Sequence, residues 1–281
     1  MELLSIHNLN ITIDQESRIV DGKLTLLPGD VTLLTGPNGC GKSTIIKLIM
    51  GDVFRYKDLD TRGTEIFFKE NPVVTENDWT TMRRRIAYVS QEDEFESEDV
   101  FECFLSSINY FLKEHKERYV FDFVKRFSIQ DCFMIDDGCN RPNRKGIKLA
   151  RRLGIKEGDL SLEDIRVLQF LTMRISGMSG GQKKLANIFT NLIRYEFCDL
   201  LILDEPLNNL DYKNVRSFSN ILTHIYQNKP TLAVLLVTHC RSIPIVSRVL
   251  EVNPPRKKLV EQERYVCNSC FGEVNSDGIY I

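Results

Sequence analysis

The stretch from position 36 to position 44 has residue types and spacing suited to holding phosphate. It consists, in order, of Gly36, Pro37, Asn38, Gly39, Cys40, Gly41, Lys42, Ser43 and Thr44. Glycines at this spacing let backbone N–H groups converge on phosphate oxygens, and a following helix adds the partial positive charge of its N-terminus. The apolar run Val31–Thr35 precedes the stretch and Ser43–Met50 follows with helical spacing, which is the context that a phosphate loop requires. We expect Lys42 to reach the β- and γ-phosphates of a nucleotide and Ser43 to ligate Mg²⁺.

A second group of reactive residues closes the apolar run Leu200–Leu203. Asp204 and Glu205 end this run, and Pro206 favours a turn directly after them. An aspartate at the end of such a strand can hold a metal ion, and a carboxylate one residue further on can polarise an attacking water. We expect this strand to lie beside the strand that leads into the phosphate loop.

Far along the chain, a second glycine-rich segment has the character of an anion cradle. Ser179, Gly180, Gly181 and Gln182 precede a helical pattern that runs through Lys183–Ile193. A helix that begins at Ser179 directs a hydroxyl group, backbone N–H groups and the helix dipole toward an anion. One nucleotide needs one phosphate loop, so the second cradle suggests that another copy of this surface closes over the nucleotide.

The apolar pattern predicts an α/β fold. Ile86–Ser90 and Leu232–Thr238 join the two apolar strands named above, and continuous apolar runs indicate strands that helices cover on both faces of a parallel sheet. Leu9–Ile13 and Leu24–Leu27 alternate around a polar stretch, which predicts an antiparallel hairpin near the N-terminus.

The middle of the chain has a different character. Val100–Leu112, Tyr119–Phe127 and Leu162–Met173 have helical spacing, and Ser161 is a suitable N-cap for the last of these helices. Cys132–Lys156 is basic and without strong periodicity, so we expect a loop there. We predict a discontinuous core formed by residues 1–93 and 179–262, a helical subdomain over 94–178, and a tail over 263–281.

Composition is ordinary for a soluble globular protein. The 281 residues are 42% hydrophobic and 27% charged, with a formal net charge of −2. This charge balance gives no global field that would attract nucleic acid. No apolar run approaches the roughly 20 residues that span a bilayer, and the first residues do not have a secretory-signal pattern. We expect a cytoplasmic protein, peripheral to the membrane at most.

Six motifs in order resemble those of the nucleotide-binding domain of the ATP-binding cassette (ABC) superfamily. The resemblance spans roughly residues 3–262. Gly36–Thr44 is similar to Walker A, Gln91 to the Q-loop glutamine, Ser179–Gln182 to the ABC signature with Met178 in place of the usual leucine, Leu200–Glu205 to Walker B, Leu207–Asp211 to the D-loop, and His239 to the switch histidine.

The resemblance implies a RecA-like P-loop NTPase fold and a Mg²⁺-dependent ATPase built from two cassettes packed head to tail, with a homodimer as the expected form. It implies that Glu205 is the catalytic carboxylate, that Asp204, Ser43 and Gln91 hold the metal ion, and that His239 contacts the γ-phosphate. Asp211 is implied to couple the two sites across the dimer.

The chain departs from the family pattern in three places. The region Asn10–Asp14 lacks the aromatic residue that stacks on adenine in many members, which leaves the preference between ATP and GTP open. The stretch between Gln91 and Ser179 is longer than usual, which indicates either an unusual partner or a variable surface loop. Cys267 and Cys270 have the spacing of a metal knuckle, but one pair provides two of the four ligands of a closed zinc site, and Cys132, Cys139 or a second subunit would have to complete it.

Two classes of function remain open from the sequence. The favoured one is the ATPase subunit of a transporter whose membrane-spanning part is a separate chain. The alternative is a soluble ABC-type ATPase that acts on a nucleic-acid, ribosomal or defence complex without transport. For a defence or regulatory complex, the basic stretch Arg141–Arg152 would be the contact surface. Cargo, direction of transport and the identity of the partner are not determined by this chain.

Overall fold

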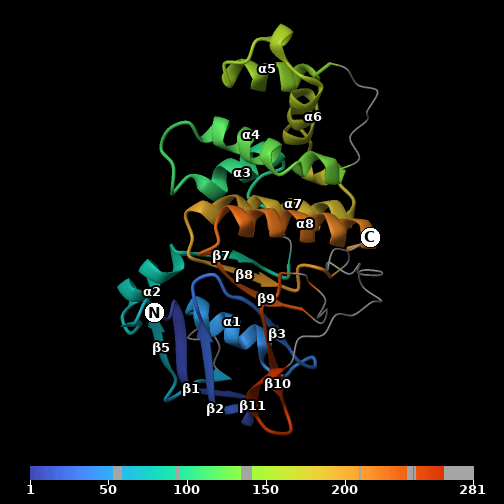
Figure 1. Ribbon diagram of the computed structural model, residues 1–281. Coiled ribbons are helices and arrows are strands. Elements are labelled where there is room, and N and C mark those ends of the chain that lie inside the picture. The colour runs from blue at the N-terminus through green and yellow to red at the C-terminus, as the bar shows by residue number, and fades with distance from the viewer. Residues whose placement is uncertain are drawn as a thin grey trace. The chain divides into compact units, whose positions relative to one another are not determined.

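The described residues fold into two compact units. The computed structural model describes residues 1–52, 59–92, 95–133, 141–208, 210–238, 243 and 245–262 (Figure 1). One unit comprises Met1–Gln91, Cys198–Leu207 and Tyr226–Ile281, and the other comprises Glu92–Phe197 and Asn208–Ile225. The sequence assigned 179–262 to the core. By contacts, 179–197 and 208–225 group with the helices, so the second anion cradle belongs to the helical unit.

A largely parallel six-stranded sheet organises the first unit. Its strands, in spatial order, are β11 (Lys258–Gln262), β10 (Arg248–Asn253), β3 (Val31–Thr35), β9 (Ala233–Val237), β8 (Leu200–Asp204) and β7 (Ile86–Val89). All neighbouring strands are parallel except β10 and β11. The four apolar strands expected from the sequence are confirmed. The prediction that β8 lies directly beside β3 is wrong, because β9 lies between them.

A second, antiparallel sheet is built on the predicted N-terminal hairpin. It contains β1 (Leu4–Ile13), β2 (Glu16–Leu26), β4 (Leu59–Asp60), β5 (Glu65–Phe68) and β6 (Asn71–Pro72). Strands β1 and β2 pair antiparallel around Asp14 and Gln15, both with positive φ, which confirms the hairpin. Leu4, Ile6, Leu9 and Ile11 of β1 are fully buried, and the register shift between Ile6 and Leu9 changes the phase of the alternation between the two faces.

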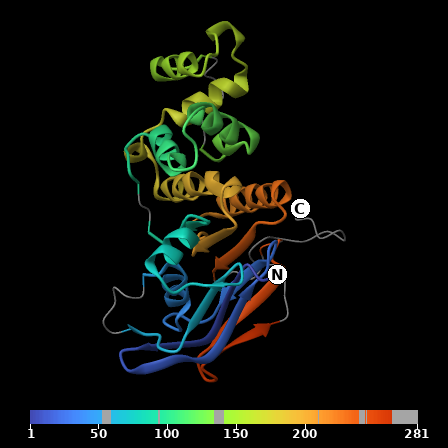
Figure 2. The ribbon, with the colours of Figure 1, turned by 90° about the vertical axis from the view of Figure 1, so that its left-hand side faces the viewer.

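Helix α1 (Lys42–Met50) contributes a buried apolar face to the core of this unit, together with residues of β1, β2, β8 and β9. It ends at Gly51, whose φ of 74° gives the left-handed residue that commonly terminates a helix. Helix α2 (Glu76–Arg83) begins with a capping box between Thr75 and Asp78. Figure 2 shows the β1–β2 and β10–β11 hairpins of this unit from a second direction, and Val20 N donates to Lys257 O at 2.8 Å between them.

The second unit is helical. It contains α3 (Val100–Ile108), α4 (Lys116–Arg126), η2 (Ile129–Phe133), α5 (Arg144–Arg152), η3 (Glu157–Asp159), α6 (Leu162–Leu171), η4 (Ile175–Gly177), α7 (Gly180–Leu192), η5 (Ile193–Glu196) and most of α8 (Tyr212–Asn228). Tilted and edge-on aromatic pairs fill its core, as in Phe104 against Phe123 and Phe170. The three helical patterns expected from the sequence are confirmed.

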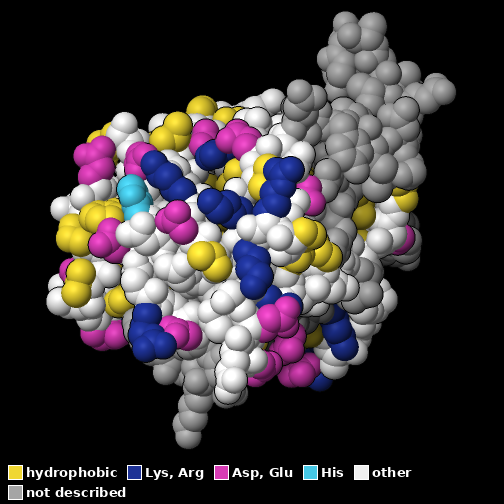
Figure 3. Space-filling view, turned by 90° about the horizontal axis from the view of Figure 1, so that it is seen from below, with side chains coloured by type: hydrophobic (Ala, Val, Ile, Leu, Met, Phe, Trp, Pro, Cys, Tyr) yellow, Lys and Arg dark blue, Asp and Glu magenta, His cyan; other side chains and the backbone are white. Residues whose placement is uncertain are grey.

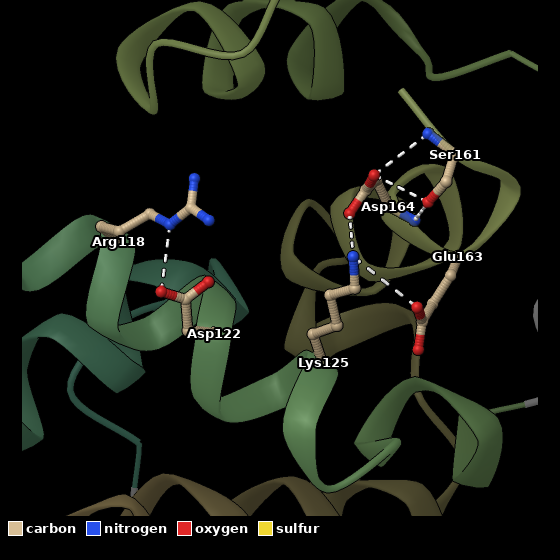
Figure 4. A network of polar contacts seen from close by, with 6 residues as sticks. All are labelled: Arg118, Asp122, Lys125, Ser161, Glu163 and Asp164. Atoms are coloured by element: carbon tan, nitrogen blue, oxygen red, sulfur yellow. Dashed lines mark hydrogen bonds and ion pairs between the residues drawn. The ribbon is translucent and has the colours of Figure 1, made fainter. Parts of the chain in front are cut away.

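Polar contacts fix helix α6 against helix α4 in this unit (Figure 4). Ser161 caps α6 as predicted, and Asp164 completes a capping box by accepting from Ser161 N. Lys125 of α4 donates to Asp164 at 2.7 Å and lies 3.6 Å from Glu163. Asp164 therefore both caps helix α6 and holds α6 against helix α4.

The expectation of a loop over 132–156 is wrong, because η2 ends there and α5 occupies 144–152. Asn143 caps α5 by accepting from Gly146 N at 2.7 Å, and Leu149 and Ala150 form the buried face. The apolar face is narrow and most other positions are charged. The helical periodicity of the apolar residues is therefore hard to see in the sequence. The exposed face of α5 carries five cations, at positions 144, 145, 148, 151 and 152.

Asp199 is expected to make the first unit sensitive to acid. It accepts from Arg85 at 2.7 Å through both carboxylate oxygens and pairs with Lys69 at 2.7 Å. Burial of the carboxyl raises its pKa, but the hydrogen bonds from Arg85 and Lys69 outweigh burial and hold the pKa below its usual value. Above the pKa of about 3.9 of an unfolded aspartate the stabilisation is fully present, and it is lost as pH falls through the lower folded pKa.

Asp199→Asn should therefore lower the free energy of unfolding by about 1–3 kcal/mol at pH 7. The difference from the unmodified protein should shrink as the pH falls below the pKa of an unfolded aspartate and through the lower folded pKa, since the native carboxyl then becomes protonated as well. Urea unfolding followed at a series of pH values measures both quantities. A difference that stayed constant over this range would show that the Asp199 charge does not stabilise the fold.

Candidate nucleotide-binding site

The phosphate loop joins the end of β3 to the start of α1. Pro37, Asn38 and Gly39 at its tip are exposed. Gly36 has φ of 145°, and a Cβ there would lie 2.8 Å from the carbonyl oxygen of Val252 and 2.9 Å from the sulfur of Cys40. A side chain at position 36 would therefore push the loop away from β10. The backbone of the loop is free to surround an anion only because this position is glycine.

The first turn of α1 presents backbone donors at the loop. Gly41, with φ of 109°, is the N-cap and has no side chain with which to satisfy the first N–H groups of the helix. Unsatisfied N–H groups and the helix dipole together make the N-terminus attractive to phosphate. Ser43 lies in this turn with its side chain exposed.

Lys42 is folded back over the loop. Its Nζ atom donates to the carbonyl oxygens of Gly36 and Pro37, both at 3.0 Å. An ammonium group has three donors, so the arrangement holds the positive charge at the loop and leaves one N–H for a phosphate oxygen. The charge is thus in place before any ligand arrives.

Cys40, inside the loop, does not have the environment of a reactive thiol. The residue is buried, and burial raises the pKa of its thiol even though Lys42 lowers it in part. The neutral thiol fills space beneath Gly36 instead of acting as a nucleophile.

The acidic pair lies at the carboxyl edge of the same parallel sheet. Asp204 is 4% exposed and ends β8 in register with Val237, and Glu205 is 7% exposed. Glu205 has φ of 48°, in the left-handed region that non-glycine residues seldom adopt, and its N–H donates to Val237 O at 2.8 Å. Strained backbone of this kind costs on the order of 1–3 kcal/mol and tends to occur at functional sites.

The side chains at this edge fit a magnesium ion in their chemistry. The Ser43 hydroxyl and the Asp204 carboxylate belong to the same unit and supply oxygen ligands, which Mg²⁺ prefers. Both follow the carboxyl ends of parallel strands, β3 and β8, so both lie at one edge of the sheet. Strand β9, between them, also ends at this edge.

The second cradle caps helix α7 in the helical unit. The Ser179 hydroxyl oxygen accepts from Gln182 N at 3.3 Å, and Ser179 N donates to Gln182 Oε1 at 3.0 Å. Ser179 and Gly180 are exposed, and a Cβ at Gly180 would meet nothing within 4 Å. The predicted helix start is confirmed. Because the Ser179 oxygen acts as an acceptor, its hydroxyl hydrogen remains able to donate to an anion.

The other predicted site residues lie on exposed chain or outside the described residues. Gln91 is exposed just after β7. Asp211 is exposed and accepts from Asn214 N at 2.8 Å in the first turn of α8. His239 lies outside the described residues, as do three cysteines of the suggested zinc site, Cys139, Cys267 and Cys270.

Zinc at the cysteines stays a prediction. Within the described ranges, no group of three or more His, Cys, Asp or Glu residues could hold a metal ion. The fourth candidate ligand, Cys132, is partly buried, and burial raises the pKa of its thiol to about 11 although Ser217 lowers it in part. Zinc binds thiolate, so this cysteine is poorly prepared as a ligand.

A family model described as ABC transporter matches residues 20–208. The chain belongs to this family. The resemblance and the P-loop fold expected from the sequence are thereby confirmed, and the chain is an ATP hydrolase of the ABC type that binds nucleotide.

Three relatives match this chain over most of their own length. The chain is 26% identical over 239 residues to the zinc uptake system ATP-binding protein ZurA of Listeria monocytogenes, with 85% of this chain and 77% of ZurA covered. It is 26% identical to the manganese transport system ATP-binding protein MntB of Listeria innocua, with 83% and 79% covered. It is 23% identical to the probable iron export ATP-binding protein FetA of Escherichia coli, with 92% and 95% covered.

Solved structures share the fold. The chain superposes on cbiO1 of Clostridium perfringens, part of the ABC transporter complex cbiONQ, with a TM-score of 0.66 at 21% identity, covering 94% of this chain and 88% of cbiO1. It superposes on the dimeric bacterial ABC transporter cassette MJ0796 with a TM-score of 0.64 at 15% identity, covering 94% and 100%.

The sequence pattern did not indicate which residues border the phosphate loop from other strands. A Cβ at Gly41 would lie 3.8 Å from Arg18 Cβ, 3.9 Å from Ile19 Cδ1 and 4.0 Å from Ile11 Cγ2. Val252 of β10 borders Gly36 in the same way. The sequence predicts the hairpin that carries three of these residues, but it does not predict that the hairpin packs against the phosphate loop.

Proposed function

We propose that this chain hydrolyses ATP in a joint between two cassettes packed head to tail, and that the cycle drives a separate membrane-spanning transport subunit. The observation that carries the proposal is the pair of anion cradles on separate units, the loop 36–44 and the exposed N-terminus of α7. One nucleotide held by the first cradle leaves the second free to close over the nucleotide of another copy. A homodimer is the simplest assembly that uses both.

Within one cassette, the loop would grip the phosphates through its backbone N–H groups, and Lys42 would donate to the β- and γ-phosphates. Mg²⁺, held by Ser43, Asp204 and Gln91, would neutralise charge on the phosphates when bound. Glu205 would accept a proton from the attacking water. Its buried position limits competing solvent at the carboxylate.

The partner cassette would complete the site. Ser179, Gly180 and Gly181 would donate to the γ-phosphate from the other side, and Gln182 would hold Ser179 in place through the capping box. His239 would contact the γ-phosphate, and Asp211 would couple the two sites. Hydrolysis would then require association of two chains.

Similarity to metal-ion systems supports transport as the purpose of the cycle. The three relatives described above are named for zinc, manganese and iron, so these cations are the first cargo to assay. Of the described helices, none has the length and apolarity needed to cross a bilayer. The proposal therefore places the chain at the cytoplasmic face of the membrane, on a polytopic partner subunit.

Purification of this chain together with a polytopic membrane protein from the cells that express it tests the transport proposal. The two chains should co-purify, and vesicles that contain both should take up or export one of the three cations when ATP is supplied. Lys42→Ala should lower this movement at least about tenfold, since the ammonium group holds the transferring phosphates. A chain that purified without any membrane protein, or whose ATP hydrolysis moved no cargo, would contradict the transport function.

The basic helix α5 favours the soluble alternative as a second candidate. Lys145 and Arg152 pair with Asp99 and Glu117, whereas Arg144, Lys148 and Arg151 make no ion pair with other described residues. Figure 3 shows the molecule from below, and acidic and basic side chains intermingle on the face seen there. Ribosomal RNA or DNA retained through purification and released by salt would favour this candidate.

A further inference from the structure

Arg18 of strand β2 lies beside the start of the phosphate-loop helix. A Cβ at Gly41, the N-cap of α1, would lie 3.8 Å from the Cβ of Arg18. The β1–β2 hairpin and α1 lie next to each other in both ribbon views (Figures 1 and 2). The hairpin is therefore a wall of the space that borders the loop.

Of the three hairpin residues that approach Gly41, only Arg18 has a side chain within reach of a ligand. Ile11 and Ile19 are buried in the core, whereas the Arg18 side chain is 32% exposed. A nucleoside attached to phosphates at the N-terminus of α1 has to lie against the surface that borders that terminus. On the hairpin side, that surface is Arg18.

The guanidinium group of Arg18 makes one ion pair and has hydrogen-bonding capacity left over. One terminal nitrogen lies 2.8 Å from Glu16 Oε2, and Nε is buried without a hydrogen-bond partner among the described residues. Glu16 and Arg18 are two positions apart on one strand, so their side chains share a face. Glu16 thus positions one edge of a planar cation, and the Arg18 side chain remains partly exposed.

We propose that Arg18 is the platform on which the purine of the bound nucleotide stacks. A guanidinium plane stacks on aromatic faces and attracts their π-electrons, and residues 8–20 of the hairpin contain no aromatic side chain that would compete for this position. The inference rests on the proposed nucleotide site and adds the group that holds the base. Stacking reads the face of the base and not its hydrogen-bonding edge, so ATP and GTP should bind within about threefold of each other.

Equilibrium binding of three ligands to the full chain tests the platform. The ligands are ATP, GTP and inorganic tripolyphosphate, and the last of these has the phosphates without a base. Arg18→Ala should weaken ATP and GTP about 5- to 30-fold and leave tripolyphosphate within about twofold. Arg18→Trp should restore nucleotide affinity because it supplies another flat surface, whereas Arg18→Lys should not, since an ammonium group is a point charge.

The outcomes separate the platform from its alternatives. An equal loss for tripolyphosphate would mean that Arg18 contacts phosphate and would overturn the proposal, as would unchanged ATP affinity in Arg18→Ala. The thermal midpoint of the ligand-free variants identifies unfolding, and rescue by Arg18→Trp distinguishes a stacking surface from a purely structural arginine. An unmodified chain that bound neither ATP nor tripolyphosphate would defeat the proposed site itself.

Discussion

Glu205→Gln should bind ATP with unchanged affinity and hydrolyse it at least about 100-fold more slowly than the unmodified chain. The amide keeps the size of the side chain and the hydrogen bond from the backbone N–H to Val237 O, but it cannot accept a proton from water. Because the nucleotide is not consumed, the ATP-bound dimer should accumulate. Steady-state phosphate release measures the rate, and size-exclusion chromatography with Mg²⁺ and ATP measures the dimer.

Lys42→Ala is the matched control for this result. It should lose ATP binding and therefore form no dimer under the same conditions, since the ammonium held at the loop is removed. Hydrolysis at the unmodified rate in Glu205→Gln would exclude Glu205 as the catalytic base. A slow variant that remained monomeric with ATP would instead argue against the joint between cassettes.

Ser179→Arg should abolish hydrolysis, with a loss of at least about 100-fold, while a single cassette still binds ATP within about threefold. The substitution removes a hydroxyl donor that would face the partner's γ-phosphate and places a bulky side chain at an exposed helix start. The phosphate loop of the same chain belongs to the other unit and is not altered. The residual rate per chain of this variant should be the same at every protein concentration, whereas the rate per chain of the unmodified protein should rise with concentration as cassettes associate.

Ser161→Arg provides a control with the same local chemistry. Ser161 is also exposed and also caps a helix through a capping box, with Asp164, so both substitutions cost a similar amount of stability, about 1 kcal/mol. Only Ser179→Arg should stop hydrolysis. Equal activity in the two variants would remove Ser179 from the site, and equal loss in both would trace the effect to the fold of the helical unit.

The strands that carry the site were predictable because they are apolar without interruption. Strands β3, β8 and β9 are buried at every position, which is typical of a parallel sheet covered on both faces. Their spatial order was not predictable from that pattern, because each of the three strands is apolar enough to occupy any central position of the sheet. The sequence therefore placed β8 beside β3 and did not foresee β9 between them.

Elements with mixed composition were harder to recognise. Strand β10 carries Arg248 and Glu251 among its apolar residues, and helix α5 hides a narrow apolar face under cations. In contrast, capping residues were informative on their own. Ser161 and Ser179 both start the helices expected from them, since a serine hydroxyl satisfies a free N–H at that position.

The site residues also differ in how far the sequence predicts them. Those in the phosphate loop and at the end of β8 follow from local motifs, because strand, turn and helix fix them together. Arg18 follows from no local motif, since its approach to Gly41 depends on how the hairpin packs against α1. Contacts between segments of this kind require three-dimensional information.

The hydrogen bond from Glu205 N to Val237 O joins the peptide of the acidic residue to the last residue of β9. His239 follows only two positions after Val237 in the chain. A shift of the backbone at the end of β9 would therefore also turn the peptide at position 205, whose φ of 48° leaves it little tolerance. The hydrogen bond therefore ties the backbone conformation of the acidic residue to the end of β9.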